Sequence, residues 1–298
     1  MIKKIFLYGA LLLALPAEGQ FAAKVNTIIG TNGMGHTFPG ACVPFGGVQV
    51  SPDTDTIPHN VGGVYQPRAY EYCAGYQHKD STIVGFSHTH FSGTGHSDLG
   101  DILLMPTTGT LRLNPGTATD PDSGYRSRFS HDTEISRPGY YEVTLADYGI
   151  KARLTATKRT GVHHYTYPEG APQRVVLDMI HGIYNYDGKV LWTNIRVEND
   201  TLVTGYRITN GWARTNYTYF AMSFSKPIVH YGCREKAKVD YRGGYGKFDM
   251  KENFPDMGGR KIVAYFEFDP AAAPDVEVKV ALSGVSTAGA LKNLQAEA

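Results

Sequence analysis

The 298-residue sequence is poor in cysteine and tryptophan and carries almost no net charge. None of its three cysteines lies in a CxxC pair, so they cannot build a tetrathiolate metal site. At most two of Cys42, Cys73 and Cys233 could pair, and we expect structural roles for all three. Lysine and arginine total 29 against 28 aspartates and glutamates. This balance gives no basic surface for a nucleic-acid backbone or an anionic membrane, so we expect no nucleic-acid partner.

Long apolar runs are also scarce, and the one that stands out covers residues 5–15. Two lysines precede this run, and the small residues Ala17 and Gly19 follow it. A basic start, a short apolar core and small residues at the cleavage site are typical of a secretory signal peptide. A bilayer-spanning helix needs about 20 apolar residues, so the run is too short to be one. We therefore expect a signal peptide at residues 1–19, export to the periplasm or the medium, and no membrane span.

Helical patterns long enough for a parallel α/β fold are missing from residues 20–283. Short apolar runs alternate there with glycine, proline, asparagine and aspartate. In the clearest run, Val276, Val278 and Val280 share one face of a strand, and polar residues occupy the other face. Many such runs predict an all-β fold, a large two-sheet antiparallel β-sandwich that residues 20–283 form as one domain.

The last segment, residues 284–298, has a different pattern. Apolar residues recur at positions 288, 291 and 294 in a helix-favouring composition, which predicts the start of a C-terminal helix. We expect Leu291 and Leu294 to face water unless another domain covers them, and therefore to form an apolar interface patch.

The densest polar cluster spans residues 85–101 and reads GFSHTHFSGTGHSDLGD. His88 and His90 at i and i+2 would point the same way on a strand and could be paired metal ligands. Alternatively, exposed serine, threonine, histidine and aspartate side chains around flexible glycines could bind sugar hydroxyls. In a third interpretation, Asp98 and Asp101 cap backbone amides in a glycine-rich turn. The residues alone leave the second and third interpretations open.

A second glycine-rich stretch, residues 26–46, has neither a GKS or GKT ending nor the GxGxxG order, so it is not a phosphate loop. We expect a tight loop that packs Phe38 and Phe45 and offers His36 and Thr37 to a surface. No GxSxG motif supports seryl catalysis. Six acidic residues could serve glycosidic cleavage, but no spacing marks an acid–base pair, and we interpret most of them as solvated loop charges: Asp53, Asp55, Glu71, Asp80, Asp98 and Asp101.

Together, these segments resemble the N-terminal domain of glycoside hydrolase family 92, a family of exo-acting, calcium-dependent α-mannosidases. The resemblance covers essentially the whole chain after the leader, and its most specific motif is GFSHTHFSGTG at residues 85–95. The other matching segments are VNTIIGT at 25–31, GHTFPGA at 35–41, PFG at 44–46, QVSPDT at 49–54, DLGDILLMPT at 98–107, RFSH at 128–131, PGYY at 138–141, LADYG at 145–149, LTAT at 154–157 and FSKP at 224–227.

The resemblance implies that an (α/α)6 barrel follows the sandwich in the full enzyme, with residues 284–298 opening the linker helix to it. That barrel holds most of the catalytic and calcium-binding residues and has no counterpart in this sequence. We therefore assign no catalytic or metal-binding residue to this chain, and we expect calcium in the full-length enzyme but none held by this chain alone. The expected partners are an α-mannoside glycan and the barrel domain of the same enzyme.

The sandwich would supply part of the −1 mannose subsite at the interface between the two domains. The residues that the resemblance carries over as substrate-binding are Gly35, His36, Thr37, Phe38, His88, Thr89, His90, Ser92, Gly93, Thr94 and Asp98. Hydrolysis of terminal α-mannosides, with inversion, is then expected only together with the barrel. The alternative is a stand-alone mannan-binding sandwich module that does not catalyse.

Overall fold

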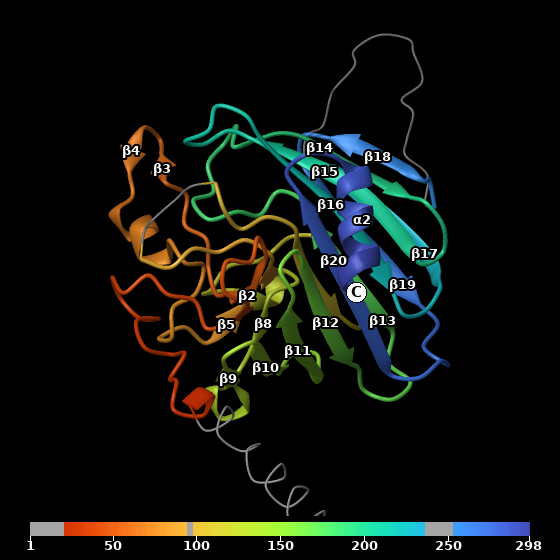
Figure 1. Cartoon of the computed structure of the whole chain (residues 1–298), viewed down its shortest axis with the longest axis horizontal. Coiled ribbons are helices and arrows are strands. Elements are labelled where there is room, and N and C mark those ends of the chain that lie inside the picture. The colour runs from red at the N-terminus through yellow and green to blue at the C-terminus, as the bar shows by residue number, and fades with distance from the viewer. Residues whose placement is uncertain (1–20, 94–97, 236–252) are drawn as a thin grey trace, which may run out of the picture.

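The computed structural model describes residues 21–93, 98–235 and 253–298. The expected signal peptide and Thr94 lie outside these residues. The described chain folds into two large antiparallel sheets that pack face to face, with one α-helix lying on the second sheet (Figure 1). This arrangement confirms the all-β sandwich with a C-terminal helix that the sequence predicts. No described helix is both long and apolar enough to cross a bilayer.

The first sheet has seven strands. In spatial order they are β1 (Ala41–Cys42), β2 (Gln49–Asp53), β6 (Gly85–Ser87), β7 (Leu103–Thr107), β13 (Gln173–Asp178), β19 (Ile262–Phe268) and β17 (Ile228–Glu235). The second sheet has nine strands. They are β18 (Asp256–Gly259), β14 (Val190–Val197), β15 (Leu202–Thr209), β16 (Asn216–Phe224), β20 (Asp275–Ser283), β12 (Thr160–Thr166), β11 (Ile150–Ala156), β10 (Tyr140–Leu145) and β9 (Ile135–Arg137).

Smaller elements lie in the connections. They are the hairpin of β3 (Asn60–Val61) and β4 (Val64–Tyr65), the pair of β5 (Thr82–Ile83) and β8 (Ser127–Arg128), and the 3-10 helices η1 (Pro67–Tyr72), η2 (Pro121–Ser123) and η3 (His131–Thr133).

One apolar core lies between the two sheets, and the period-two pattern of the strands builds it. In β20, Val276, Val278 and Val280 are fully buried, whereas the polar residues between them are only half-buried. Strand β13 differs because all six of its residues are buried. Its neighbours β7 and β19 flank it in the middle of the first sheet, and its apolar residues Val175, Val176 and Leu177 are buried on both faces.

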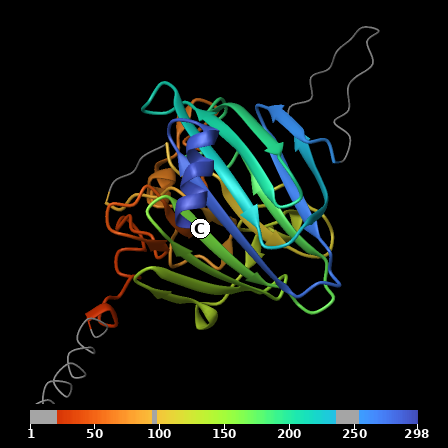
Figure 2. The same ribbon diagram turned by 45° about the vertical axis from the view of Figure 1, so that its right-hand side comes forward.

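The C-terminal helix α2 (Thr287–Glu297) begins at Ser286, whose side chain accepts a hydrogen bond from the Gly289 amide at 2.9 Å. It lies across the face of the nine-stranded sheet that points away from the core (Figure 2). Ala290 and Leu294 pack there against two small side chains of the sheet, one in β16 and one in β20.

The expectation that Leu291 and Leu294 face water was wrong. Leu294 is only 6% exposed, and Leu291 is half-buried against the same cluster. The physical reason is that Ala221 and Ala281 have small side chains, which allow the helix to pack closely on the sheet. At the far end of α2, Glu297 pairs with Arg159 at 2.6 Å and holds the helix on the sheet.

Loops from distant parts of the chain gather beside the β3–β4 hairpin and η1, on the left of Figure 1. Three non-glycine residues in these loops have left-handed backbone angles: His36 (φ 53°), Ile102 (φ 56°) and Tyr184 (φ 52°). A β-branched residue such as Ile102 rarely adopts this conformation, and such strain costs on the order of 1–3 kcal/mol. Strained backbone of this kind concentrates at functional sites, so these loops are the first place to look for one.

Candidate functional site

The structure brings together the two loops that the sequence marks as substrate-facing. The Gly93 amide donates a hydrogen bond to the His36 carbonyl oxygen at 2.7 Å, which ties residues 35–38 to residues 88–93. The Phe38 ring lies 5.3 Å from the His90 ring, centroid to centroid. The edge of the His36 ring meets Tyr70 of η1 at 4.6 Å. Residues 35–38, Tyr70 and residues 88–93 are far apart in the sequence but form one continuous surface, which we call the loop face.

The predicted site residues differ in their access to solvent. Exposed are Gly35, Ser92 and Gly93, half-buried are Thr37, Phe38, Thr89 and Asp98, and buried are His36, His88 and His90. The interpretation of the histidines as exposed side chains was therefore wrong. The expectation that Phe45 packs was also wrong, because Phe45 lies in the turn between β1 and β2 with a left-handed backbone (φ 59°) and its side chain is fully exposed. The ring nitrogens of His88 and His90 form hydrogen bonds inside the protein in place of those to water, whereas Nε2 of His36 has no partner among the described residues.

His88 lies at the end of β6 in a chain of hydrogen bonds whose direction can be worked out. Its Nδ1 donates to the Ile102 carbonyl oxygen at 2.6 Å, so its Nε2 must accept. The donor is Nε2 of His163, at 2.8 Å. Nδ1 of His163 in turn accepts from the Tyr165 hydroxyl at 2.8 Å. Both rings are thus neutral and have no nitrogen left for a ligand.

Burial explains why these rings stay neutral. It lowers the pKa of His88 from 6.5 to about 4, against an opposing contribution from the hydrogen bond to Ile102. It also lowers the pKa of His163 well below its ordinary value, and the neighbouring His88 adds to this effect. A charged imidazole here would have no solvent around it, so the neutral forms predominate at pH 7.

His90 belongs to a buried ion pair with Asp53 of β2. Its Nδ1 donates to the Gln49 carbonyl oxygen at 2.8 Å, and its Nε2 lies 2.8 Å from the Asp53 carboxylate. Because both ring nitrogens face acceptors, the ring is the imidazolium. His181 approaches the other carboxylate oxygen of Asp53 at 2.7 Å. Burial alone would raise the pKa of the Asp53 carboxyl, but the charge and hydrogen bonds of the two histidines hold it well below its usual range.

We call His88, His90, His163 and His181, together with Asp53, the interior histidine cluster. Neither His88 nor His90 belongs to a group of three metal-ligating side chains within the described residues. The cluster holds the loop face on the first sheet through bonds that are already satisfied. Asp53 and Asp101 are also buried, in contrast to the expectation of solvated loop charges, because both are paired with basic side chains.

Thr89 and Asp101 connect the loop face to a second buried group. The Thr89 hydroxyl donates to Asp101 at 2.9 Å, and the other oxygen of this carboxylate lies 3.4 Å from the guanidinium of Arg207. Lys189 lies beside Arg207, and its ammonium donates to the Ile183 carbonyl oxygen. Burial first, and then the charge of Arg207, lower the pKa of Lys189 to about 7. Asp101, Arg207 and Lys189 therefore form a buried polar group that is joined to the loop face through Thr89.

Asp98 caps backbone amides, as one interpretation of the sequence proposed, but these amides belong to a distant loop. Its carboxylate accepts hydrogen bonds from the amides of Trp212 at 2.9 Å and Ala213 at 3.2 Å. The Trp212 side chain is 80% exposed. Tryptophan is usually buried, so an exposed Trp212 whose backbone amide is hydrogen-bonded to a carboxylate of another loop indicates a binding surface.

Trp212 forms one wall of an aromatic pocket of about 620 Å³. Tyr184 also lines it, held by a 2.7 Å contact between its hydroxyl and the Cys73 thiol. Among the described residues, its lining consists of His59, Asn60, Gly62, Tyr184, Tyr186, Asp187, Gly211 and Trp212. Aromatic faces combined with amide, imidazole and carboxylate groups suit a polar ligand that has an apolar face, such as a pyranose ring.

Sequence reasoning missed this pocket because its residues come from three separate loops. The available signal was the Asn210-Gly211-Trp212 turn, which contains one of only two tryptophans in the chain.

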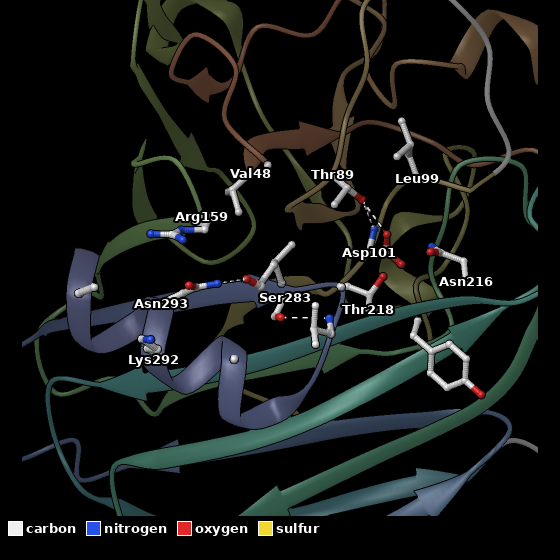
Figure 3. Close-up of a pocket in the computed structure, with 17 residues that line it drawn as sticks. Val48, Thr89, Leu99, Asp101, Arg159, Asn216, Thr218, Ser283, Lys292 and Asn293 are labelled. Carbon is white, nitrogen blue, oxygen red and sulfur yellow. Dashed lines mark hydrogen bonds between the residues drawn. The ribbon is translucent and has the colours of Figure 1, made fainter.

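A larger groove of about 770 Å³ runs between α2, β20 and the loop face. Figure 3 shows Thr89 and Asp101 hydrogen-bonded to one another on one side of this groove, with Lys292 and Asn293 of α2 on the other. Within the part of the chain that the structure describes, Tyr217 is the one aromatic side chain that lines it, so the groove offers little for a sugar ring to stack on. The aromatic pocket is therefore the better candidate site.

Comparison with known proteins agrees with this architecture. The chain is similar to the family GH92 alpha-mannosidase BT3965 from Bacteroides thetaiotaomicron, whose structure was determined in complex with mannoimidazole, at 40% identity and a TM-score of 0.80. It is also similar to the family GH92 inverting mannosidase BT2199 from the same organism, at 26% identity and a TM-score of 0.70. These alignments cover 92% and 93% of this chain but only 34% and 33% of the two enzymes.

A curated relative is an uncharacterized secreted glycosidase of Arthroderma benhamiae, which is 30% identical over 165 residues. The alignment covers 52% of this chain and 18% of that protein. The chain thus spans about a third of the length of its solved relatives and less than a fifth of the curated one. Residues 24–283 match the glycosyl hydrolase family 92 N-terminal domain. The match covers nearly the whole described chain, and the chain therefore belongs to this family.

Proposed function

We propose that this chain is the N-terminal sandwich domain of an exported α-mannosidase and forms part of the wall of its −1 mannose subsite. Family membership and similarity to two mannosidases support the substrate class. A relative that is described as secreted supports export. Hydrolysis of terminal α-mannosides, with inversion, would then require an (α/α)6 barrel joined to the sandwich through the helix at residues 284–298.

The observation that carries this proposal is the exposed Trp212, held at the rim of the aromatic pocket by the carboxylate of Asp98. The Trp212 ring would cover the apolar face of a mannose residue, and Asn60 and Asp187 would bind its hydroxyls. Thr37 and Ser92, on the neighbouring loops, are not among the residues that line this pocket, and their contact with the mannoside stays a prediction for the enzyme with its barrel. His88 and His90 would act as positioning residues, because their hydrogen bonds hold these loops in place.

We further propose that catalysis needs residues outside this chain. An inverting glycosidase uses an acid and a base carboxylate about 6.5–9.5 Å apart, with a water between them. Asp53 and Asp101 are buried beside basic side chains, and Asp55 pairs with Arg126 at 2.9 Å. These carboxylates are committed to structural ion pairs.

Calcium takes 6–8 oxygen ligands. The one group of three potential ligand side chains within the described residues includes two imidazoles, which suit a different kind of metal ion. We propose that calcium binds to the barrel of the full-length enzyme.

Binding of methyl α-mannoside to the purified chain tests the proposal, measured by saturation-transfer NMR. Half a subsite buries little of a sugar, so we expect a dissociation constant of about 1 mM, which corresponds to about 4 kcal/mol. Trp212→Ala should weaken binding by about tenfold. Trp192→Ala is the matched control, since it removes the other tryptophan, which lies on β14 and outside the aromatic pocket. Equal binding by both variants would contradict the proposed site.

An aryl α-mannoside assay with calcium tests the need for the barrel. We expect no turnover by the chain alone and measurable turnover when a family 92 barrel domain is added. Clear turnover by the chain alone, abolished by Asp98→Asn or Asp101→Asn, would place the catalytic carboxylates in this chain and overturn the proposal.

The second candidate is a stand-alone mannan-binding module. It is favoured by one observation: Ala290 and Leu294 of α2 are buried on the chain's own sheet, so this face of the helix needs no further domain to cover it. A module would bind polymeric mannan equally well with and without a barrel domain, whereas half of an enzyme would gain affinity when the barrel is added. The neighbouring genomic sequence gives a second distinction, since an adjacent barrel-encoding frame would favour the enzyme.

A further inference from the structure

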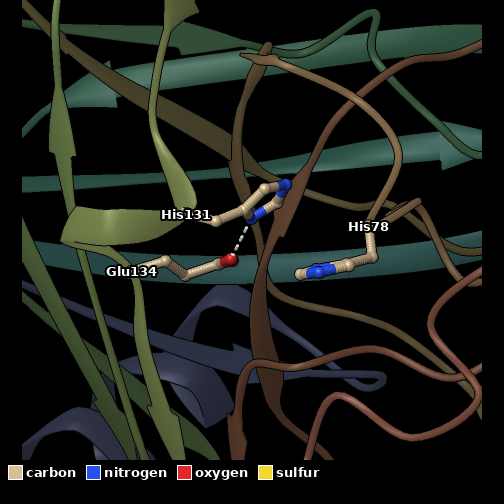
Figure 4. A group of neighbouring side chains, drawn as sticks. All are labelled: His78, His131 and Glu134. Carbon is tan, nitrogen blue, oxygen red and sulfur yellow. Dashed lines mark hydrogen bonds and ion pairs between the residues drawn. The ribbon is translucent and has the colours of Figure 1, made fainter.

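Two histidines and a glutamate meet on the surface at a place that the proposed function does not use. His78 lies in the loop after η1, His131 opens η3, and Glu134 directly follows η3. One ligand atom from each of the three lies within 4.8 Å of the others. Figure 4 shows His131 and Glu134 on one segment and His78 reaching toward them from another. We call these three residues the surface histidine cluster.

Glu134 is the fixed member of this cluster. One of its carboxylate oxygens accepts from the hydroxyls of Tyr76 at 2.8 Å and Tyr141 at 2.7 Å. The other accepts from Nδ1 of His131 at 2.6 Å. The side chain is only 3% exposed, so these bonds define its position. Bonds of this kind from outside the ligand set commonly orient the carboxylate ligand of a metal ion.

The two imidazoles lie close to one another and have different surroundings. Their ring centroids are 4.0 Å apart, with 36° between the ring planes. The edge of the Phe129 ring supports His131 at 5.0 Å. Nδ1 of His78 lies 3.3 Å from the Tyr76 hydroxyl. This hydroxyl gives its single proton to Glu134, so its oxygen accepts from His78 Nδ1–H and leaves Nε2 of His78 with a free lone pair.

We propose that His78, His131 and Glu134 form a binding site for a divalent transition-metal ion of the zinc class. Two imidazoles and one carboxylate are a ligand set typical of zinc sites that keep an open fourth position. Imidazole ligands also disfavour calcium and magnesium, which prefer oxygen. His131 is 38% exposed, so the ion has a path to the site, and water can occupy the fourth position.

Binding requires only a small rearrangement. Ligand atoms of a tetrahedral zinc ion lie about 3.3 Å apart, given bond lengths of about 2.0–2.1 Å. The exposed ring of His131 can turn by the distance needed while Glu134 stays fixed by the tyrosines. If His131 binds through Nδ1, the proton on that atom moves by way of water to Nε2, and the ring stays neutral. The bound ion would join the loop at His78 to η3 and so stabilise the folded chain.

Titration of the chelator-treated, tag-free chain with Zn2+, in competition with a chromophoric chelator, tests this site. We expect one equivalent to bind. His131→Ala and His78→Ala should each weaken the affinity by at least about tenfold. Co2+ provides an independent signal, since tetrahedral coordination gives intense visible absorption bands that His131→Ala should abolish. Saturating Zn2+ should also raise the Tm of the wild-type chain by about 5 °C and leave that of His131→Ala unchanged.

His164→Ala is the matched control. His164 also pairs with a carboxylate on the surface, that of Asp275 at 3.0 Å and with similar exposure, but this pair is not part of a three-ligand group within the described residues. This variant should bind Zn2+ like the wild type. Equal affinity of His131→Ala and the wild type would overturn the proposal. So would an equal loss in His164→Ala, because the zinc would then be bound by scattered surface histidines.

Discussion

The interior and surface histidine clusters both combine histidines with a carboxylate, but they differ in how their ring nitrogens are hydrogen-bonded. In the interior cluster every ring nitrogen of His88, His90 and His163 has a hydrogen-bond partner. In the surface cluster, hydrogen bonds fix Glu134, and the side chain of His131 is 38% exposed to solvent. The HxH motif marks the interior cluster in the sequence, whereas His78 and His131 lie far apart. A motif rich in polar residues can therefore mark a structural hydrogen-bond network as well as a ligand-binding site.

The largest effect should come from removing the carboxylate at the centre of the interior cluster. Asp53→Asn leaves the His90 imidazolium buried without its counter-charge, and breaking such a pair typically costs about 3–5 kcal/mol. Urea unfolding followed by circular dichroism measures this loss. The control is Asp275→Asn, which removes the partner of the exposed His164 and should change stability by less than about 1 kcal/mol. Similar losses in the two variants would remove the distinction between buried and exposed pairs.

A slightly smaller effect is expected at Gly75, which packs against the same carboxylate. Its φ of +79° is left-handed, and a Cβ atom there would overlap the Oδ1 atom of Asp53. Gly75→Ala should therefore combine backbone strain with a steric clash, for a loss of about 3 kcal/mol. Gly170→Ala isolates the strain, because Gly170 has a φ of +69° and no described heavy atom within 4 Å of that Cβ. Its loss should be about 1 kcal/mol in the same unfolding experiment.

Acid should weaken the fold through the interior cluster. The unfolded chain takes up a proton on His88 as the pH falls below 6.5, whereas the folded chain does so only near its pKa of about 4. Between these values the unfolded state binds more protons, so stability decreases as the pH falls. The unfolding free energy should be about 2 kcal/mol lower at pH 5 than at pH 7 from this residue alone. A flat profile over this range would contradict the neutral hydrogen-bond chain.

The smallest effect is expected at the surface cluster without metal. His131→Ala removes an exposed ring, and Glu134 keeps its bonds to two tyrosine hydroxyls. The unfolding free energy of the metal-free chain should change by less than about 0.5 kcal/mol. A loss above 1 kcal/mol would show that the His131–Glu134 pair is structural, like the pairs of the interior.

The fold was largely predictable because strands carry a local signature. Alternating valines at 276, 278 and 280 identify a strand with one buried face, and the spacing of 288, 291 and 294 identifies the final helix. The coverage of Leu294 was not predictable, since it depends on small residues of two other strands that meet only in the folded sheet.

The sequence by itself determined the all-β class, the family and the two loops that form the loop face, because each of these can be recognised from residues that are contiguous in the chain. Only the tertiary structure decided which histidines are buried, where Asp98 directs its carboxylate, and that Trp212 lines a pocket with residues from other loops. It also decided that His78 meets His131 and Glu134. The physical reason is that burial and ligand geometry are properties of pairs of distant segments, and the pairing of segments is fixed by the packing of the two sheets.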